Sequence, residues 1–231
     1  IVTSVAIAVE QVLMTALKKH RATEERVADE EVRRLQRRMV LLKFENDRLE
    51  QYSRRETLRI VGLQEEKGEN VEQKVIDLFT ATGADVTTND ISVVHRTGGG
   101  RHRGGPRHIL VRLISRRKRR EVMVAKKTLK EKDNYKGVFI NDDLTPMRSR
   151  LLGYVKESQR FGRVWSSDGR ILCLKKLPTG AQRDPNERPL VIETADDLFD
   201  AGFDNIDLVR LGVQDWYVPC FDDEEDEDDD E

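Results

Sequence analysis

The N-terminal part of the chain constrains the fold most, because residues 5–53 contain neither glycine nor proline and are largely good helix formers. Such a run predicts one helix of about 70 Å. Its apolar residues follow the 3-4-3-4 spacing of heptad a and d positions, with a polar residue at one a position. The seam consists of Val32, Leu35, Met39, Leu42, Asn46 and Leu49. We therefore expect residues 1–53 to form a coiled-coil oligomerisation helix.

The seam changes frame upstream, where Val5, Val9, Val12 and Ala16 keep heptad spacing in another register. This shift predicts a stutter between the two parts of the helix. The alternatives are an amphipathic helix lying on a domain, or a charged helix that spans solvent. Association is favoured, since a domain of about 100 residues could not cover so long a seam, and an exposed seam attracts a partner.

After residue 53 the apolar period changes from helical to alternating, which predicts strands. We expect strands at 57–63, 91–95, 108–114 and 137–141, and helices at 71–82 and 116–130. The order βαββαβ is the split-βαβ, ferredoxin-like arrangement that RNA-recognition (RRM) domains use. The predicted fold class is therefore α+β, with an RRM-like RNA-binding domain at 54–144.

A small α+β subdomain is expected at 145–221. Thr145 followed by Pro146 predicts a helix N-terminus, and this helix should run to about Phe161. A hairpin at 164–174, a strand at 190–193 and a short helix at 195–201 complete the subdomain, to which we assign nucleic-acid binding. The last ten residues, 222–231, are all Asp or Glu and should form a disordered tail.

The charge distribution points to a polyanionic partner. The net charge of −2 includes the ten acids of the tail, so the rest of the chain is basic. Residues 93–130 hold thirteen Lys or Arg against one acid, Glu121. Such a surface is typical of nucleic-acid binding. The tail either keeps the protein soluble or competes with RNA for this basic surface.

Other function classes find no support in the sequence. Two cysteines cannot build a disulfide framework or a zinc knuckle, and the histidines lack metal-ligand spacing. No motif of a hydrolase, nucleotide-binding loop or metalloprotease occurs. Glu10 and Gln11 interrupt the apolar segment at 1–17, which argues against a membrane span. We expect no enzyme activity, no cofactor, no metal and no small-molecule substrate.

Four stretches resemble the first-open-reading-frame protein of LINE-type non-LTR retrotransposons, in order and spacing, over about residues 30–200. They are 49–63 (LEQYSRRETLRIVGL), 94–96 (VHR), 105–112 (GPRHILVR) and 138–145 (VFINDDLT). The resemblance implies a trimeric coiled coil, an RNA-recognition domain and a C-terminal domain that together coat the element's transcript as a nucleic-acid chaperone. It also implies cytoplasmic ribonucleoprotein particles, with a nuclear pool left open.

One departure from the family concerns oligomeric state. The family's trimer signature places Glu after the d position, whereas Lys43 follows Leu42 here. A trimer is therefore favoured over a dimer by the resemblance alone.

The candidate RNA contacts are mostly arginines. The two central strands hold no aromatic residue apart from His108, so base stacking on the sheet should be weak. Arg59 and Arg112 alternate out of phase with their apolar neighbours and should face RNA. On the C-terminal side, basic residues that include Lys156 and the aromatics Tyr154, Phe161 and Trp165 could supply the stacking that the sheet lacks. The alternative is that these aromatics form the core of that subdomain. The predicted contacts are Arg54, Arg55, Arg59, Arg96, Arg101, Arg103, Arg107, Arg112, Arg116, Arg117, Arg119, Arg120, Arg148 and Tyr154.

The partner expected from these residues is single-stranded RNA, bound with low sequence specificity. Single-stranded DNA and duplexes are left open as alternatives. A rival interpretation is a host-adapted coiled-coil scaffold that binds proteins, but it would predict a neutral or acidic sheet and loop.

Overall fold

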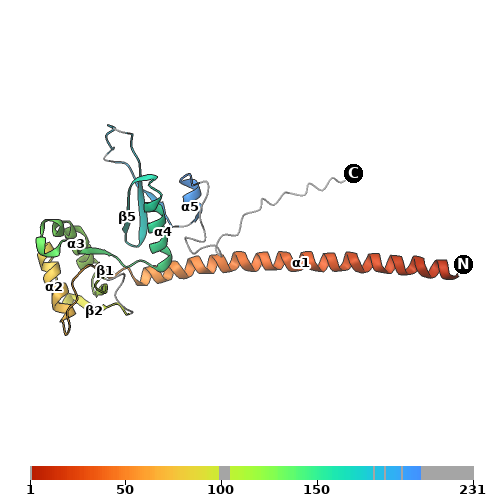
Figure 1. Cartoon of the computed structure of the whole chain (residues 1–231), viewed down its shortest axis with the longest axis horizontal. Coiled ribbons are helices and arrows are strands. Elements are labelled where there is room, and N and C mark those ends of the chain that lie inside the picture. The colour runs from red at the N-terminus through yellow and green to blue at the C-terminus, as the bar shows by residue number, and fades with distance from the viewer. Residues whose placement is uncertain (1, 99–104, 179, 185, 194, 204–231) are drawn as a thin grey trace. The chain divides into compact units, whose positions relative to one another are not determined.

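The computed structural model describes residues 2–98, 105–178, 180–184, 186–193 and 195–203 (Figure 1). The chain divides after Asn46 into two compact units. The helical residues before that point belong to one unit, and the folded part that begins at Asp47 forms the other. The last turns of the N-terminal helix therefore belong to the folded unit rather than to a separate coil.

Helix α1 runs without interruption over Val2–Ser53, which confirms the long helix expected from the absence of glycine and proline. Pairs such as Arg21–Glu25 and Arg26–Glu30, each four residues apart, add roughly 0.3–0.5 kcal/mol apiece to such a helix. The heptad residues are exposed in the single chain; Leu35 is 53 % exposed and Leu42 57 %. An apolar seam of this kind is a candidate association surface.

The helices and strands that follow α1, from β1 to β4, have the expected order βαββαβ. It consists of β1 (Thr57–Val61), α2 (Val71–Thr82), β2 (Ile91–Arg96), β3 (Ile109–Leu113), α3 (Arg116–Ala125) and β4 (Phe139–Asp142). The strands form an antiparallel sheet in the order β2-β3-β1-β4. The α+β class is confirmed. Helix α3 is shorter than expected, since the chain continues from Lys126 to Glu131 as a 3₁₀ helix.

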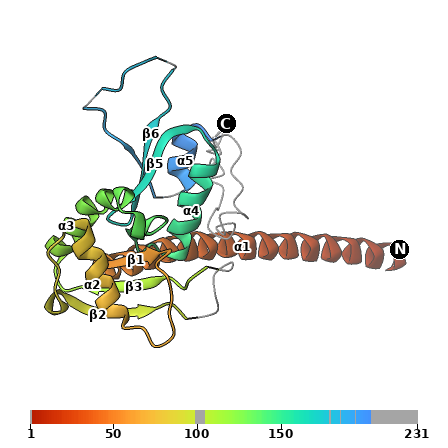
Figure 2. The ribbon, with the colours of Figure 1, turned by 60° about the vertical axis from the view of Figure 1, so that its left-hand side comes forward.

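Helices α2 and α3 cover one face of this sheet (Figure 2). Leu58 and Ile60 of β1 point into the core beside Phe79 of α2 and Val122 of α3. Gly62 follows β1 directly, and its φ of +85° favours glycine. A Cβ atom at Gly62 would lie 2.2 Å from the carbonyl oxygen of Gly137, so no larger residue fits there.

The C-terminal elements form a second, three-stranded antiparallel sheet, β5-β6-β7, with two helices. The elements are α4 (Pro146–Glu157), β5 (Phe161–Ser167), β6 (Arg170–Lys175), β7 (Leu190–Ile192) and α5 (Ala195–Asp200). Thr145 caps α4 as expected, because its side chain accepts a hydrogen bond from the Arg148 backbone N–H. Asp168 and Gly169 turn the hairpin with positive φ angles. The acidic tail lies outside the described residues.

Candidate nucleic-acid interface

The sheet face opposite α2 and α3 carries the outward residues of the four strands. Register places Arg59 of β1 between Leu110 of β3 and Asn141 of β4, and Thr57 beside Arg112. Because side chains alternate along a strand, these residues share the face that the helices do not cover. The expectation that Arg59 and Arg112 point away from the core is therefore confirmed.

Arg59 does not project freely from this face, since it is paired with Asp143. Its Nε and Nη2 atoms donate to Asp143 Oδ1 over 3.1 and 2.7 Å. Its Nη1 atom lies 3.5 Å from Nδ1 of His108. The Asp143 side chain is only 4 % exposed, whereas that of Arg59 is 30 % exposed. The pair holds the guanidinium in a fixed plane at the surface.

The same carboxylate also binds Arg54, the first residue after α1. Arg54 Nη1 donates to Asp143 Oδ2 over 2.9 Å, and Arg54 Nη2 donates to Glu50 over 2.6 Å. Burial lowers the pKa of Arg54, but the hydrogen bonds and negative charges of Glu50 and Asp143 together raise it by more. The pKa of Arg54 therefore lies above its ordinary value. Asp143 therefore fixes two guanidinium groups.

A cleft of about 580 Å³ opens beside this pair. One wall comes from the sheet face and the end of α1, and the other from α4 and β5. It is lined by four cations, Arg54, Arg59, Lys126 and Lys156, together with His108, Asn141, Asp142, Leu144, Pro146, Ser149, Leu152, Val164, Trp165 and Ser166. Positive charge, an aromatic ring and an amide thus line a single hollow.

The carboxylate in this cleft, Asp142, is buried and paired with Arg119. Arg119 also donates to Asp168 of the β5–β6 hairpin over 2.7 Å. Beside them, Lys126 donates to the carbonyl oxygen of Ile140 over 2.8 Å. The pKa of Lys126 lies below its ordinary value, chiefly because the side chain is buried. The negative charge of Asp142 raises this pKa in part, and the positive charge of Arg119 lowers it. The prediction that Arg119 contacts RNA disagrees with its burial, because its side chain is only 6 % exposed.

Arg148 is a second predicted RNA contact that the fold buries. Its Nε donates to Asp47 Oδ2 over 2.7 Å, and its Nη1 donates to the carbonyl oxygen of Gly169 over 2.9 Å. Thr145 Oγ1 donates to the other oxygen of Asp47 over 2.5 Å. Arg148 therefore connects α4 with the end of α1 and the β5–β6 turn, and is unavailable to a phosphate.

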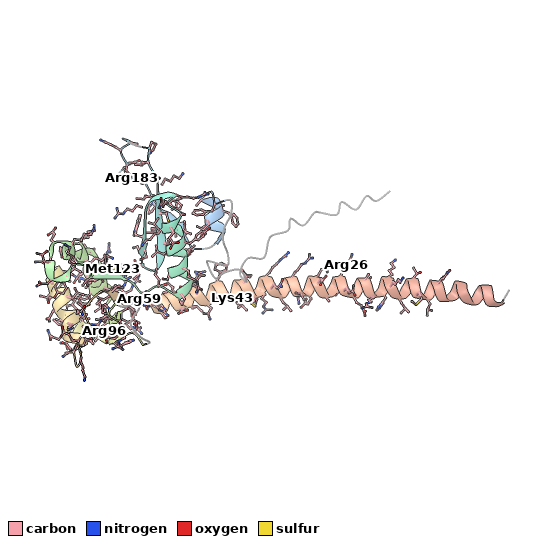
Figure 3. The ribbon with its side chains drawn as sticks, viewed as in Figure 1. Arg26, Lys43, Arg59, Arg96, Met123 and Arg183 are labelled. Carbon is pink, nitrogen blue, oxygen red and sulfur yellow. The ribbon has the colours of Figure 1, made fainter. Side chains whose placement is uncertain are left out.

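Arg96, the third such residue, lies on the edge strand β2, away from Arg59 (Figure 3). Its side chain is 4 % exposed and donates to both carboxylate oxygens of Glu69, over 2.7 and 3.1 Å. It also donates to the carbonyl oxygens of Leu63, Gln64 and Arg107. The bonds from Arg96 lower the pKa of Glu69 to about 2. Arg96 is a structural residue that ties loops together.

The remaining predicted contacts are at the surface or outside the described residues. Arg55 lies 3.6 Å from the ring centre of Tyr52, Arg107 is paired with Glu65, and Arg112 is paired with Glu56. Three others, Arg116, Arg117 and Arg120, are exposed on α3, which covers the opposite face of the sheet. Arg101 and Arg103 lie outside the described residues.

The tyrosine among the predicted contacts packs within the C-terminal subdomain. The ring of Tyr154 lies 5.9 Å from that of Phe203, and the ring of Phe161 lies 6.1 Å from that of Phe203. Tyr154 is not among the residues that line the cleft, whereas Trp165 is. Of the three aromatics considered for stacking, Trp165 is therefore the one placed to meet a ligand.

Sequence reasoning missed three residues. Asn141 and Lys126 line the cleft, and Phe139 is 59 % exposed on the same sheet face as Asn141. The alternation of β4 around the buried Ile140 could have placed Phe139 and Asn141 outward. No local signal could have placed Lys126, because it begins a 3₁₀ helix where a continuous α-helix was expected.

Comparisons with protein families and with curated proteins do not bear on this interface. No protein-family model matches the sequence, and no curated protein matches it either. Within the described part of the chain, no group of three or more His, Cys, Asp or Glu side chains could hold a metal ion. None of the described helices is long and apolar enough to cross a membrane.

Proposed function

We propose that this protein binds single-stranded RNA through the cleft between the β2-β3-β1-β4 sheet and the C-terminal subdomain, without catalysing a reaction. The observation that carries the proposal is the charge of the cleft. Arg54, Arg59, Lys126 and Lys156 line it. Glu50 and Asp143 offset the charge of the two arginines, and Asp142 is paired with Arg119, so the excess positive charge rests on Lys126 and Lys156. A hollow with this balance attracts a polyanion.

The dimensions and chemistry of the cleft favour a single strand over a duplex. A hollow of about 580 Å³ accommodates unstacked nucleotides but not a base-paired helix. Proteins that read single strands combine a cationic groove with an aromatic side chain on which a base stacks. Trp165 supplies that ring here, whereas the outward positions of β1 and β3 carry no aromatic. We accordingly propose an RRM-like domain that binds RNA without the pair of aromatic residues that such domains usually carry on their two central strands.

Oligomerisation through the heptad seam is the second part of the proposal. The seam residues of α1 are exposed in the single chain. Linked copies that bind one strand raise the apparent affinity by roughly 10²–10⁴ over a single copy. Together with the resemblance to the LINE first-open-reading-frame protein, this supports a trimeric nucleic-acid chaperone that coats RNA in cytoplasmic ribonucleoprotein particles.

The proposal is tested by measuring RNA affinity across salt. Two phosphates neutralised per protomer, one by each lysine, predict a loss of roughly sevenfold between about 50 and about 200 mM salt. Lys156→Gln should weaken binding and make this dependence shallower, because it removes one phosphate contact. Lys132→Gln, an exposed lysine outside the cleft, is the matched control. Absence of RNA binding at low salt, or equal effects of the two variants, would overturn the proposal.

A further inference from the structure

Asn141 places a side-chain amide in the cleft. It is exposed, it faces the same side of the sheet as Arg59, and it lines the hollow. Its amide makes no hydrogen bond to another described residue. An Asn amide offers one acceptor and two donors within a single plane. It is therefore able to read a base edge rather than a phosphate.

The groups around Asn141 are suited to hold a flat ring. Trp165 of β5 lines the same cleft, and the guanidinium of Arg163 lies 5.1 Å from the Trp165 ring centre. Arg59, the register partner of Asn141 on β1, has its guanidinium plane fixed by Asp143. Aromatic rings and guanidinium planes are the surfaces on which unstacked bases rest in protein–RNA complexes.

We propose that the cleft contains an adenine-binding subsite in which the Asn141 amide pairs with the base edge and Trp165 and Arg59 provide stacking surfaces. This inference rests on the proposed RNA binding and adds a base preference to it. Adenine places an amino donor beside a ring-nitrogen acceptor on two of its edges, which matches the donor and acceptor of an Asn amide. Cytosine offers this pattern on one edge only and has a smaller ring to stack.

The proposal changes the expected specificity of the protein. Contacts to phosphate are the same for every sequence, so a protein held by arginine and lysine alone should not distinguish bases. A bidentate amide contact discriminates against the wrong base by roughly 5- to 100-fold. We expect about a fivefold to tenfold preference, since the sheet face around Asn141 is open to solvent.

The test compares oligonucleotides of equal length and charge. The full-length protein is titrated with an oligouridine and with the same oligomer carrying adenines, cytosines or guanines at spaced positions. Spaced substitutions avoid the self-stacking of an adenine run. Adenine-containing RNA should bind at least about fivefold more tightly than oligouridine. Asn141→Ala should abolish this difference while changing oligouridine affinity by less than about twofold.

Asn89→Ala is the matched control, because Asn89 is exposed and does not line the cleft. It should retain the full preference for adenine. Two results would overturn the subsite while leaving RNA binding intact: equal affinity of the wild-type protein for all four oligomers, or an adenine preference that survives in Asn141→Ala. Absence of binding to any oligomer would instead overturn the proposed function itself.

Tryptophan fluorescence gives a second readout. The chain has two tryptophans, so Trp216→Phe leaves Trp165 alone. Adenine-containing RNA should quench this fluorescence and saturate at the same concentration as the binding curve, since the base stacks on the ring. Binding without any change in Trp165 fluorescence would overturn the proposed stacking and with it the subsite.

Discussion

The Nε atom of Arg148 donates to Oδ2 of Asp47 over 2.7 Å, and this bond joins helix α4 to the last turns of α1. Both side chains are buried. Gln51, one turn further along α1, donates to the carbonyl oxygen of Asp143 and accepts from the backbone N–H of Thr145. The end of the N-terminal helix is therefore hydrogen-bonded to the segment that forms one edge of the cleft, so α1 contributes to the interface as well as carrying the seam.

Asp47→Ala should destabilise the folded unit, because it leaves the Arg148 guanidinium buried without its charge partner. Removing one partner of a buried ion pair costs about 3–5 kcal/mol. The free energy of unfolding, measured with urea, should fall by about 3 kcal/mol. Arg48→Ala, a neighbouring exposed residue, should change it by less than about 0.5 kcal/mol. Equal stability of the two variants would contradict the role assigned to Asp47.

The free energy of unfolding should decrease in acid, because the Glu69 carboxylate becomes protonated. The bonds from Arg96 lower its pKa from 4.5 to about 2 in the folded state. A lowered folded-state pKa means that the stabilisation is complete above the unfolded pKa and is lost as the pH falls toward 2. The free energy of unfolding of the wild type should exceed that of Glu69→Gln at pH 6, and the two values should converge near pH 2.

Glu131→Gln serves as the control for this pH series, since Glu131 is exposed at the end of a 3₁₀ helix. Its unfolding curve should follow that of the wild type at every pH. A constant difference between the wild type and Glu69→Gln from pH 6 to pH 2 would show that Glu69 contributes through packing rather than charge.

Disrupting the seam should weaken RNA binding from a distance. Leu42→Gln places a polar residue at a d position, so sedimentation should report a smaller species. Loss of linked copies should then lower RNA affinity by about 10²-fold or more. Leu41→Gln is the matched control, because Leu41 is also exposed but lies outside the seam. Unchanged affinity in a verified monomer would contradict the dependence on oligomerisation.

Removing residues 222–231 should tighten RNA binding at low salt if the ten acids compete with RNA for the cationic cleft. Screening reduces this competition, so the gain should disappear near 1 M salt, where the Debye length is about 3 Å. Replacing the same ten residues by alternating Ser and Asn keeps the length and removes the charge. A gain from truncation that this replacement does not reproduce would exclude an electrostatic cause.

The local patterns of the sequence located the elements but not all of their ends, since α3 ends at Ala125 and α4 at Glu157, earlier than expected. The glycine-free run predicted α1, alternation predicted the strands, and the Thr145–Pro146 pair predicted the start of α4. Each of these signals depends on residues within a few positions of one another, because helix and strand periodicity and capping are short-range effects. The same is true of the outward direction of Arg59 and Arg112.

The roles of the arginines depended on the tertiary structure. Arg148 is paired with Asp47, 101 positions away, and Arg59 with Asp143, 84 positions away. Charge counting treats all arginines alike, whereas burial and a long-range carboxylate make some of them structural and leave others at the cleft. Short-range patterns and composition predict a helical and sheet-forming chain that is basic before its acidic tail. Only the packing of distant segments decided which cations, and which amide, line a common surface.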